Sequence, residues 1–380
     1  MKRIGVLAAL MFGMVSAAGA QSFCVLYAFS GGADGDQPYG GLVMGSSGIL
    51  YGTTVGGGQG GGVVFSVKKS TCKQGANTVL HRFGSKDGDG LAPFDTLRVD
   101  PTGKYLYGTT LNGGSANAGT VFRLTIQGNK EEIINVSENW GLANPYAGLT
   151  GTDTDLYGVA YNSGTKNMGG VFGPNGRVLH NFGSITNDGA NPYGGVVVSK
   201  GRIYGTTRYG GGGNPGNGTV YSVNTNGSGY KVLHRFSGPS DGTQPYSKLL
   251  VDESTGNIYG TTIMGGKYNQ GTIFEMSPAG KILRQYNFGA QANDGEEPAG
   301  NLVMDAQHNI FGTTIYGSAN GNGVIYKLDS SFQMTVLHAF GVLDGGHPEG
   351  GLMMDSSGDL YGTAPNLGLY GSGTVFRFVR

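Results

Sequence analysis

Charged side chains are scarce in this sequence of 380 residues, where they make up 13%, and the 25 basic residues match the 25 acidic ones. A protein that holds nucleic acid by electrostatics needs a net positive field, which this balance does not provide. No stretch after the first residues approaches the roughly 18 uncharged apolar residues of a membrane span. We therefore expect neither a nucleic-acid partner nor a membrane span.

Catalytic and cofactor motifs are also missing. The sequence has no GxSxG nucleophile elbow and no HExxH zinc motif. The GxGxxG match at 56–62 carries little weight in a chain with 75 glycines, and it leads into a predicted strand rather than a helix. The KDGDG segment at 86–90, taken with Asp95, lacks the bidentate Glu of a calcium loop. We expect no cofactor and no metal ion.

Only two cysteines are present, Cys24 and Cys72. Residues 1–20 have a positive start, an apolar run and the small residues Ala18-Gly19-Ala20, which together predict a signal peptide and export to the periplasm or the medium. Disulfides persist in such compartments, so Cys24 and Cys72 are a candidate pair, although only the Cα geometry can decide whether they bond.

What the chain has in abundance is a repeat. An aromatic-Gly phrase, Tyr-Gly-Thr-Thr in its fullest form, returns seven times, at intervals of 56, 50, 47, 55, 52 and 50 residues, on Tyr51, Tyr107, Tyr157, Tyr204, Tyr259, Phe311 and Tyr361. A period near 50 indicates propeller blades or solenoid units. Each unit holds four short β-rich runs separated by Gly, Asn and Asp, as in a four-stranded blade.

The phase of the repeat decides between a ring and a rod. The mature chain begins with a fourth-type strand at 25–29 and ends on a third-type strand at 374–378, and no polar caps of a solenoid are visible. Pairing of these two segments would close the ring and protect its edge. We predict an all-β chain in which residues 21–380 form one seven-bladed propeller, closed by the N-terminal strand completing blade seven.

Repeats built from DGxxP, GGLVMD, LYGTT, GTVF and VLHxF resemble the GloVer-type tandem repeats of exported bacterial proteins, the choice-of-anchor group. The resemblance covers nearly all of the chain after residue 20. It implies export, a repeat-built β domain and no established enzymatic activity. Members often carry a C-terminal sorting tail, which we do not find here, so we expect a periplasmic or released protein.

Two polar positions recur with the repeat. The connectors carry Asp34, Asp89, Asp188, Asp241, Asp294 and Asp344, and the second strands carry Thr53, Thr109, Thr206, Thr261, Thr313 and Thr363. Blade three lacks both. We interpret them as structural turn residues, with Asp241 accepting from local amides and from the Thr261 hydroxyl, because a catalytic pair needs two unlike environments rather than six similar ones. Four histidines share one fourth-strand position with two tyrosines, which indicates packing or hydrogen bonding: His81, His180, His234, His338, Tyr27 and Tyr286.

A binding face is expected where the glycine-rich loops and the DGxxP connectors emerge together. Its candidate aromatic residues are Tyr161, Tyr209, Tyr268, Tyr316 and Tyr370. The strongest asymmetry lies between blades two and three, where the repeat is least well kept. The candidate ligand-binding residues there are Trp140, Glu138, Asn139, Tyr161 and Asn162. An aromatic ring beside amide and carboxyl groups suits a sugar, although drift of one repeat explains the same pattern.

The sequence thus favours a monomeric, exported, non-catalytic scaffold that binds an extracellular glycan or protein. The alternative is a polysaccharide lyase or hydrolase that uses the same loop face, and it is supported by fold analogy alone.

Overall fold

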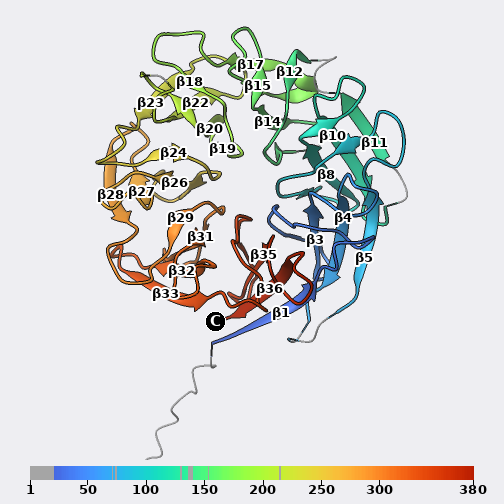
Figure 1. Cartoon of the computed structure of the whole chain (residues 1–380). Helices are drawn as coiled ribbons and strands as arrows, with labels where there is room; N and C mark the ends of the chain where they lie inside the picture. The colour runs from blue at the N-terminus through green and yellow to red at the C-terminus, as the bar shows by residue number, and fades with distance from the viewer. Residues whose placement is uncertain are drawn as a thin grey trace, which may run out of the picture.

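The computed structural model describes residues 21–70, 72, 75–128, 131–135, 140–152, 154–213 and 215–380, with only the backbone described for 131–135. In these residues, seven antiparallel blades stand around a central axis (Figure 1). The predicted all-β propeller is therefore confirmed. The predicted signal peptide, residues 1–20, lies outside the described residues.

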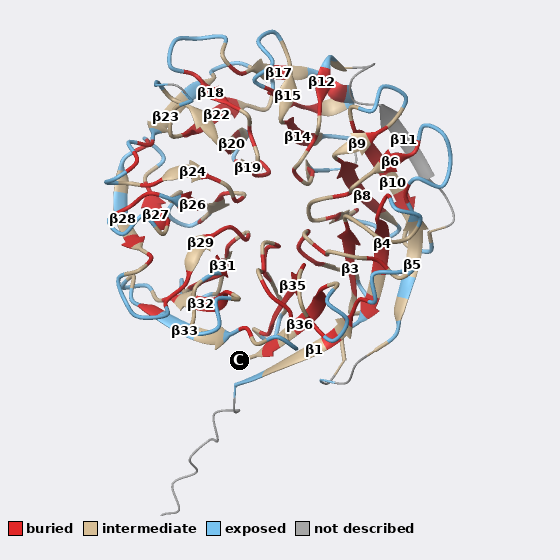
Figure 2. Cartoon of the chain, viewed as in Figure 1, coloured by how far each residue is buried: buried red, intermediate tan, exposed pale blue. Residues whose placement is uncertain are grey.

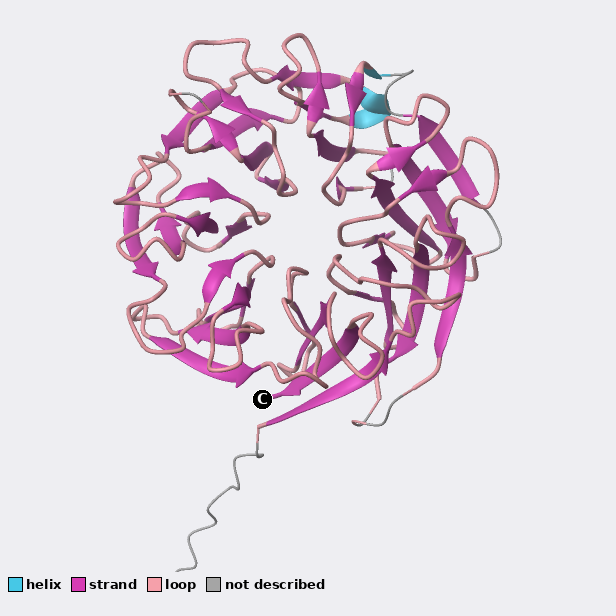
Figure 3. Ribbon diagram, viewed as in Figure 1, coloured by secondary structure: helices cyan, strands magenta, loops and turns pink. Residues whose placement is uncertain are grey.

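In each blade the four strands lie side by side, with the first strand nearest the axis and the fourth strand on the outside (Figure 3). The first strands are β2 (Val43–Met44), β7 (Arg98–Val99), β13 (Thr150–Gly151), β19 (Val197–Ser199), β25 (Leu250–Val251), β30 (Val303–Met304) and β34 (Met353–Met354). The second strands are β3 (Ile49–Thr54), β8 (Tyr105–Thr110), β14 (Leu156–Ala160), β20 (Arg202–Thr207), β26 (Ile258–Met264), β31 (Ile310–Tyr316) and β35 (Leu360–Ala364). The third strands are β4 (Val63–Lys68), β10 (Thr120–Thr125), β16 (Gly170–Phe172), β22 (Thr219–Asn224), β27 (Thr272–Met276), β32 (Val324–Leu328) and β36 (Thr374–Val379). The fourth strands are β5 (Asn77–Arg82), β11 (Glu131–Asn135), β17 (Val178–Asn181), β23 (Lys231–Arg235), β28 (Ile282–Asn287), β33 (Met334–Ala339) and, for blade 7, β1 (Ser22–Ala28).

Short strands in the connectors pair with the ends of second strands or with the loops after them. They are β6 (Gly90–Leu91) with β9 (Asn112–Gly113), β12 (Leu142–Ala143) with β15 (Asn162–Ser163), β18 (Gly189–Ala190) with β21 (Tyr209–Gly210), and β24 (Thr243–Pro245) and β29 (Glu296–Pro298) with β26 and β31. A 3-10 helix, η1 (Pro174–Gly176), precedes β17. These pairings hold five of the seven connectors against their own blades.

The repeated glycine of the second strand makes room for an aromatic ring. Gly52 is paired with Phe65 of the third strand, and a Cβ on Gly52 would lie 2.6 Å from the tip of that ring. Gly260 stands in the same relation to Phe274. A side chain at either glycine would displace the ring, so the two phrases of the repeat encode a single packing unit.

Aromatic rings also join each blade to the next. The phenylalanine after a fourth strand packs on the third-strand ring of the following blade, as Phe83 does on Phe122 with ring centroids 5.0 Å apart. The equivalent pairs are Phe29 with Phe65, Phe182 with Tyr221, Phe236 with Phe274, Phe288 with Tyr326 and Phe340 with Phe376. The core therefore lies between neighbouring blades, where buried residues concentrate (Figure 2).

The ring closes through its two ends, as predicted. β1 pairs antiparallel with β36, with Val25 opposite Phe376 and Ala28 opposite Thr374, and it lies beside β36 at the bottom of Figure 1. Cys24 of β1 forms a disulfide with Cys72, which precedes β5 of blade 1, and their Cα atoms are 5.4 Å apart. Strand pairing and a covalent bond thus join blade 7 to blade 1.

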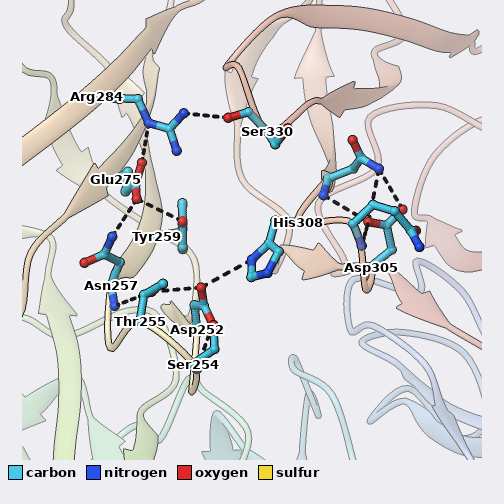
Figure 4. Close-up of polar contacts among 12 residues, drawn as sticks. Asp252, Ser254, Thr255, Asn257, Tyr259, Glu275, Arg284, Asp305, His308 and Ser330 are labelled. Carbon is cyan, nitrogen blue, oxygen red and sulfur yellow. Dashed lines mark hydrogen bonds and ion pairs between the residues drawn. The ribbon is translucent and has the colours of Figure 1, made fainter.

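Polar side chains tie neighbouring blades together at the turns between first and second strands and between third and fourth strands. His308 Nδ1 of blade 6 lies 3.3 Å from Asp252 Oδ2 of blade 5 (Figure 4). Arg284 of blade 5 donates to Glu275 and to the carbonyl of Ser330 in blade 6.

Across the described residues, no helix is long and apolar enough to cross a membrane.

Candidate functional site

One residue per blade, directly after the connector proline or its equivalent, lines one end of the axis. The seven residues are Tyr39, Phe94, Tyr146, Tyr193, Tyr246, Ala299 and Glu349, and we call them the axial ring. With neighbouring glycines, Asp95, Ser247 and Asn301, they border a cavity of about 40 Å³. The sevenfold repeat is broken here, because five positions hold aromatic rings and the last two do not.

The connectors position the axial ring through a strained turn. The residue before each connector proline has a φ between 55° and 58° although none is glycine: Gln37, Ala92, Asn144, Asn191, Gln244, Glu297 and His347. Its amide donates to a carbonyl in the loop between the second and third strands of the preceding blade around the ring, as Glu297 does to Gln270 at 3.0 Å and Gln37 does to Ser372 of blade 7 at 3.1 Å. Surrounding structure must enforce such a conformation. Because this backbone conformation occurs in all seven blades, it is part of the scaffold that orients the side chains of the axial ring.

The five aromatic residues pack against one another. Tyr39 stacks on Phe94 with centroids 4.9 Å apart, and Phe94 meets Tyr146 at 5.3 Å. Tyr193 contacts Tyr146 at 4.5 Å and Tyr246 at 4.1 Å. Each of the five keeps part of its surface exposed. They form a continuous aromatic surface on one side of the axis, bordered by solvent.

Glu349 completes the axial ring and is its one carboxyl group. Its Oε2 lies 3.2 Å from the Tyr246 hydroxyl, which is also 2.6 Å from the Tyr193 hydroxyl. A hydroxyl has one proton to donate, so Tyr246 serves one of these acceptors at a time. Burial raises the pKa of Glu349 to about 7, with the Tyr246 hydrogen bond opposing and Glu297 adding to the rise. A buried carboxyl without a countercharge behaves in this way.

Charged groups stand at the rim of the ring. The Arg208 guanidinium lies 5.7 Å from the Tyr193 ring centroid and 5.9 Å from that of Tyr246, and its Nε donates to Gln244 at 3.0 Å. Burial and the nearby Glu296 raise the pKa of Glu297, which Arg208 opposes. The rim is therefore positive toward blade 4 and acidic toward blades 6 and 7.

The structure separates the residues that were predicted to form a site between blades two and three. Tyr161 reaches the axial ring, with its centroid 5.4 Å from Tyr146, and Asn162 donates to Asn144 Oδ1 at 2.9 Å. Trp140 instead packs on Phe172 with centroids 5.0 Å apart, beside Gly176. It contacts the third-strand ring that the fourth-strand phenylalanine contacts in the other blades. Glu138 and Asn139 lie outside the described residues. A binding role for Trp140 stays a prediction.

The other loop tyrosines surround the ring or lie away from it. Tyr209 contacts Arg208 at 5.4 Å, and Tyr316 contacts His347 with centroids 5.0 Å apart. Tyr268 and Tyr370 are 43% and 61% exposed. They remain candidates of the loop face and are not members of the axial ring.

The connector aspartates contact His or Tyr side chains of the fourth strands and not the threonines of the second strands. Asp241 accepts from the Ser237 amide at 2.7 Å and lies 2.9 Å from His234 Nε2, whereas Thr261 hydrogen bonds Ser247. The predicted Asp241–Thr261 bond is therefore wrong. The same pairing recurs between His180 and Asp188, His338 and Asp344, Tyr286 and Asp294, and Tyr27 and Asp34, while His81 lies 3.6 Å from Asp89. Both imidazole N–H and phenol O–H can donate to a carboxylate, which explains why His and Tyr exchange at this position.

The described ranges contain no group of three His, Cys, Asp or Glu residues arranged to hold an ion. The carboxylates of the KDGDG region are separated, because Asp89 accepts from the Gly90 amide and Asp95 from the Gly148 amide.

Sequence reasoning missed the axial ring. The sequence signal for this ring is the residue that follows each connector proline. It is aromatic in blades 1 to 5, alanine in blade 6 (Ala299) and glutamate in blade 7 (Glu349). The predicted asymmetric site lies in blade three, where the Tyr-Gly-Thr-Thr phrase is least well kept. The two residues that change the chemistry of the axis, Ala299 and Glu349, lie in blades 6 and 7, although the strands of these blades follow the repeat closely.

Comparisons with known proteins agree with this architecture. The model of the Gloeobacter/Verrucomicrobia repeat matches residues 9–211 and 173–376. No curated protein matches the chain in sequence. Among solved structures, the chain is similar to the extracellular domain of a putative hybrid two component system from B. thetaiotaomicron, with a TM-score of 0.58, 13% identity, and coverage of 91% of this chain and 40% of that one. It is also similar to a GH74 enzyme of Niastella koreensis, with a TM-score of 0.60, 15% identity, and coverage of 94% and 53%. The chain thus spans about two fifths to one half of these proteins, and the likeness concerns the fold.

Proposed function

Since this chain belongs to the Gloeobacter/Verrucomicrobia repeat family, whose repeats here build a propeller with one asymmetric axial ring, we propose that it is an exported, non-catalytic binding scaffold. Its ligand is an extracellular glycan or protein, and the axial ring with its rim is the binding site. The similar domain from B. thetaiotaomicron is extracellular, which is in line with export.

The observation that carries the proposal is the partly exposed aromatic surface of Tyr39, Phe94, Tyr146, Tyr193 and Tyr246. Aromatic rings give a large contact area at low cost in side-chain entropy, and tyrosine adds a polar tip that can hydrogen bond a ligand. Arg208 and Glu297 at the rim add one donor group and one acceptor group. This combination suits the alternating apolar and hydroxyl faces of a sugar.

A hydrolase is the second candidate, because Glu297 and Glu349 are two carboxyl groups in unlike surroundings. Such a difference is what acid–base catalysis requires, and a pKa of about 7 would keep Glu349 partly protonated at neutral pH.

One screen tests both functions. Purified protein is passed over immobilised polysaccharides and extracellular proteins, and both retention and soluble products are measured. A scaffold retains its ligand without product release, and the Tyr146→Ala plus Tyr193→Ala variant loses retention while Leu283→Ala, at an exposed position of the outer strand β28, keeps it. Release of oligosaccharides would establish the hydrolase instead. Retention that is unaffected in the double variant would place the site elsewhere.

A further inference from the structure

The carboxyl group of Glu349 sits at the axis without a cationic partner. Across the described part of the chain, the hydrogen bond that reaches its carboxylate comes from the Tyr246 hydroxyl, and no Lys, Arg or His nitrogen lies within 4.0 Å of it. Arg208 stands over the rings of Tyr193 and Tyr246 and bonds Gln244. Carboxylates that are largely removed from water are normally paired, and this half-buried carboxylate has no cationic partner.

The walls around Glu349 are those of a cation site. The negative faces of aromatic rings attract ammonium groups, and the attraction grows when water is excluded. Tyr39, Tyr193 and Tyr246 line the same cavity as Glu349. Its volume of about 40 Å³ exceeds the roughly 10–15 Å³ that one water molecule needs, so an ammonium group of similar size fits this space.

Ala299 opens the way to this space. It occupies the blade 6 position of the axial ring, between Tyr246 of blade 5 and Glu349 of blade 7. A ring at this position, as in blades 1 to 5, would stand between the two. Its methyl group leaves them in contact, so the acidic corner faces the aromatic surface directly.

We propose that the axial ring selects glycans that carry a free amino group, with the ammonium seated between Glu349 and the tyrosine rings while the sugar lies on the aromatic surface and the rim. This inference rests on the proposed binding function and specifies its ligand class. An amino sugar supplies the apolar ring face and the positive charge together, and an N-acetylated sugar lacks the charge.

Binding of a cation beside Glu349 should depend on pH, because the charge of this carboxyl group depends on pH. The titratable and charged groups that face Glu349 are Tyr246, Tyr193 and Tyr39 in the ring, Asp95 in the same cavity with Lys248 near it, and Glu297 at the rim, with Arg208 beyond them. Burial raises the pKa of all three tyrosines, so they stay neutral at physiological pH. Glu349 is thus the group that changes charge, and a cation must displace its proton at acidic pH.

The test compares two disaccharides of glucosamine, one with free amines and one fully N-acetylated, by isothermal titration at pH 6.5. The expected result is at least about tenfold tighter binding of the free amine form to the wild type. Glu349→Gln, which keeps the shape and removes the charge, should bind both forms alike. Glu253→Gln, which removes an exposed carboxyl group in the turn between β25 and β26, should behave as the wild type. Equal affinity for the two forms in the wild type, or a preference that survives in Glu349→Gln, would overturn the inference.

Methylammonium provides the second arm, because it is small and its charge does not titrate over this pH range. Its affinity should rise about tenfold from pH 5.5 to 8 in the wild type and stay flat in Glu349→Gln. If methylammonium binds in this way but no sugar does, the ammonium site stands and the glycan function fails. If the acetylated sugar binds, methylammonium does not, and the amine form shows no advantage, the glycan function stands and the ammonium site fails. Binding of none of them contradicts the ammonium site.

Discussion

Tyr246 and Glu349 meet across Ala299: the hydroxyl of the first lies 3.2 Å from Oε2 of the second, although they enter the axis from blades 5 and 7. They are separated by 103 residues in the chain. The contact exists because the position between them holds a methyl group in place of a ring. It makes one corner of an otherwise repetitive axis acidic.

Filling that corner should abolish ligand binding while the fold survives. Ala299 is 3% exposed and packs with Ile263 and Ile315. In Ala299→Phe, a sixth ring would separate Tyr246 from Glu349, and overpacking should cost about 1–3 kcal/mol of unfolding free energy. Ligand titration and urea unfolding measure the two effects. Ala299→Ser serves as the control and should retain binding; undiminished binding in Ala299→Phe would contradict the site.

The contribution of Glu349 to the stability of the folded protein should fall as pH rises from about 5 to 8. Burial raises the pKa of Glu349 from an ordinary 4.5 to about 7 in the folded protein. Between these values the folded state binds more protons than the unfolded state, so its advantage is complete below pH 4.5 and is lost as pH rises through 7. The loss is at most about 3 kcal/mol, and smaller because the side chain keeps some contact with water. Unfolding of Glu349→Gln across this range should lack that component; parallel curves for the two proteins would refute it.

The fourth-strand position should accept tyrosine but not leucine. His234 Nε2 lies 2.9 Å from Asp241, and Tyr286 donates to Asp294 in the equivalent place. His234→Tyr should keep the unfolding free energy within about 1 kcal/mol, whereas His234→Leu leaves a half-buried carboxylate with fewer donors and should cost about 1–3 kcal/mol. Chemical denaturation of both variants measures this. Equal stability of the leucine variant would show that the pair is dispensable.

Removing the disulfide should weaken ring closure. Cys24 and Cys72 enclose a separation of 48 residues, for which the loss of unfolded-chain entropy corresponds to about 4 kcal/mol. We expect Cys24→Ser with Cys72→Ser to lower the melting temperature, and the wild type in reductant to do the same. Reductant should leave the double variant unchanged. A wild type that melts identically with and without reductant would speak against closure by this bond.

Trp140 should matter for packing between blades 2 and 3. Its ring contacts Phe172 as Phe83 contacts Phe122 one blade earlier. Trp140→Ala should cost about 3–5 kcal/mol, and Trp140→Phe should recover much of it. Ligand retention, measured at a temperature where both variants are folded, decides whether Trp140 also binds. Retention lost in both variants despite intact folding would give it a binding role.

The sequence by itself determined the blades and their closure. Gly52 and Phe65 belong to one hairpin, and the same spacing recurs along the chain, so local pattern encodes each strand and its neighbour. The phase of the repeat also predicted that β1 completes blade 7. Only the tertiary structure decided which distant side chains meet. Glu349 joins Tyr246 and Tyr193, and Asp241 pairs with His234 in place of Thr261, because these contacts depend on where the curved ring places equivalent positions of separate repeats. Periodicity along a chain fixes strands, but the closing of seven blades around one axis sets the chemistry at its centre.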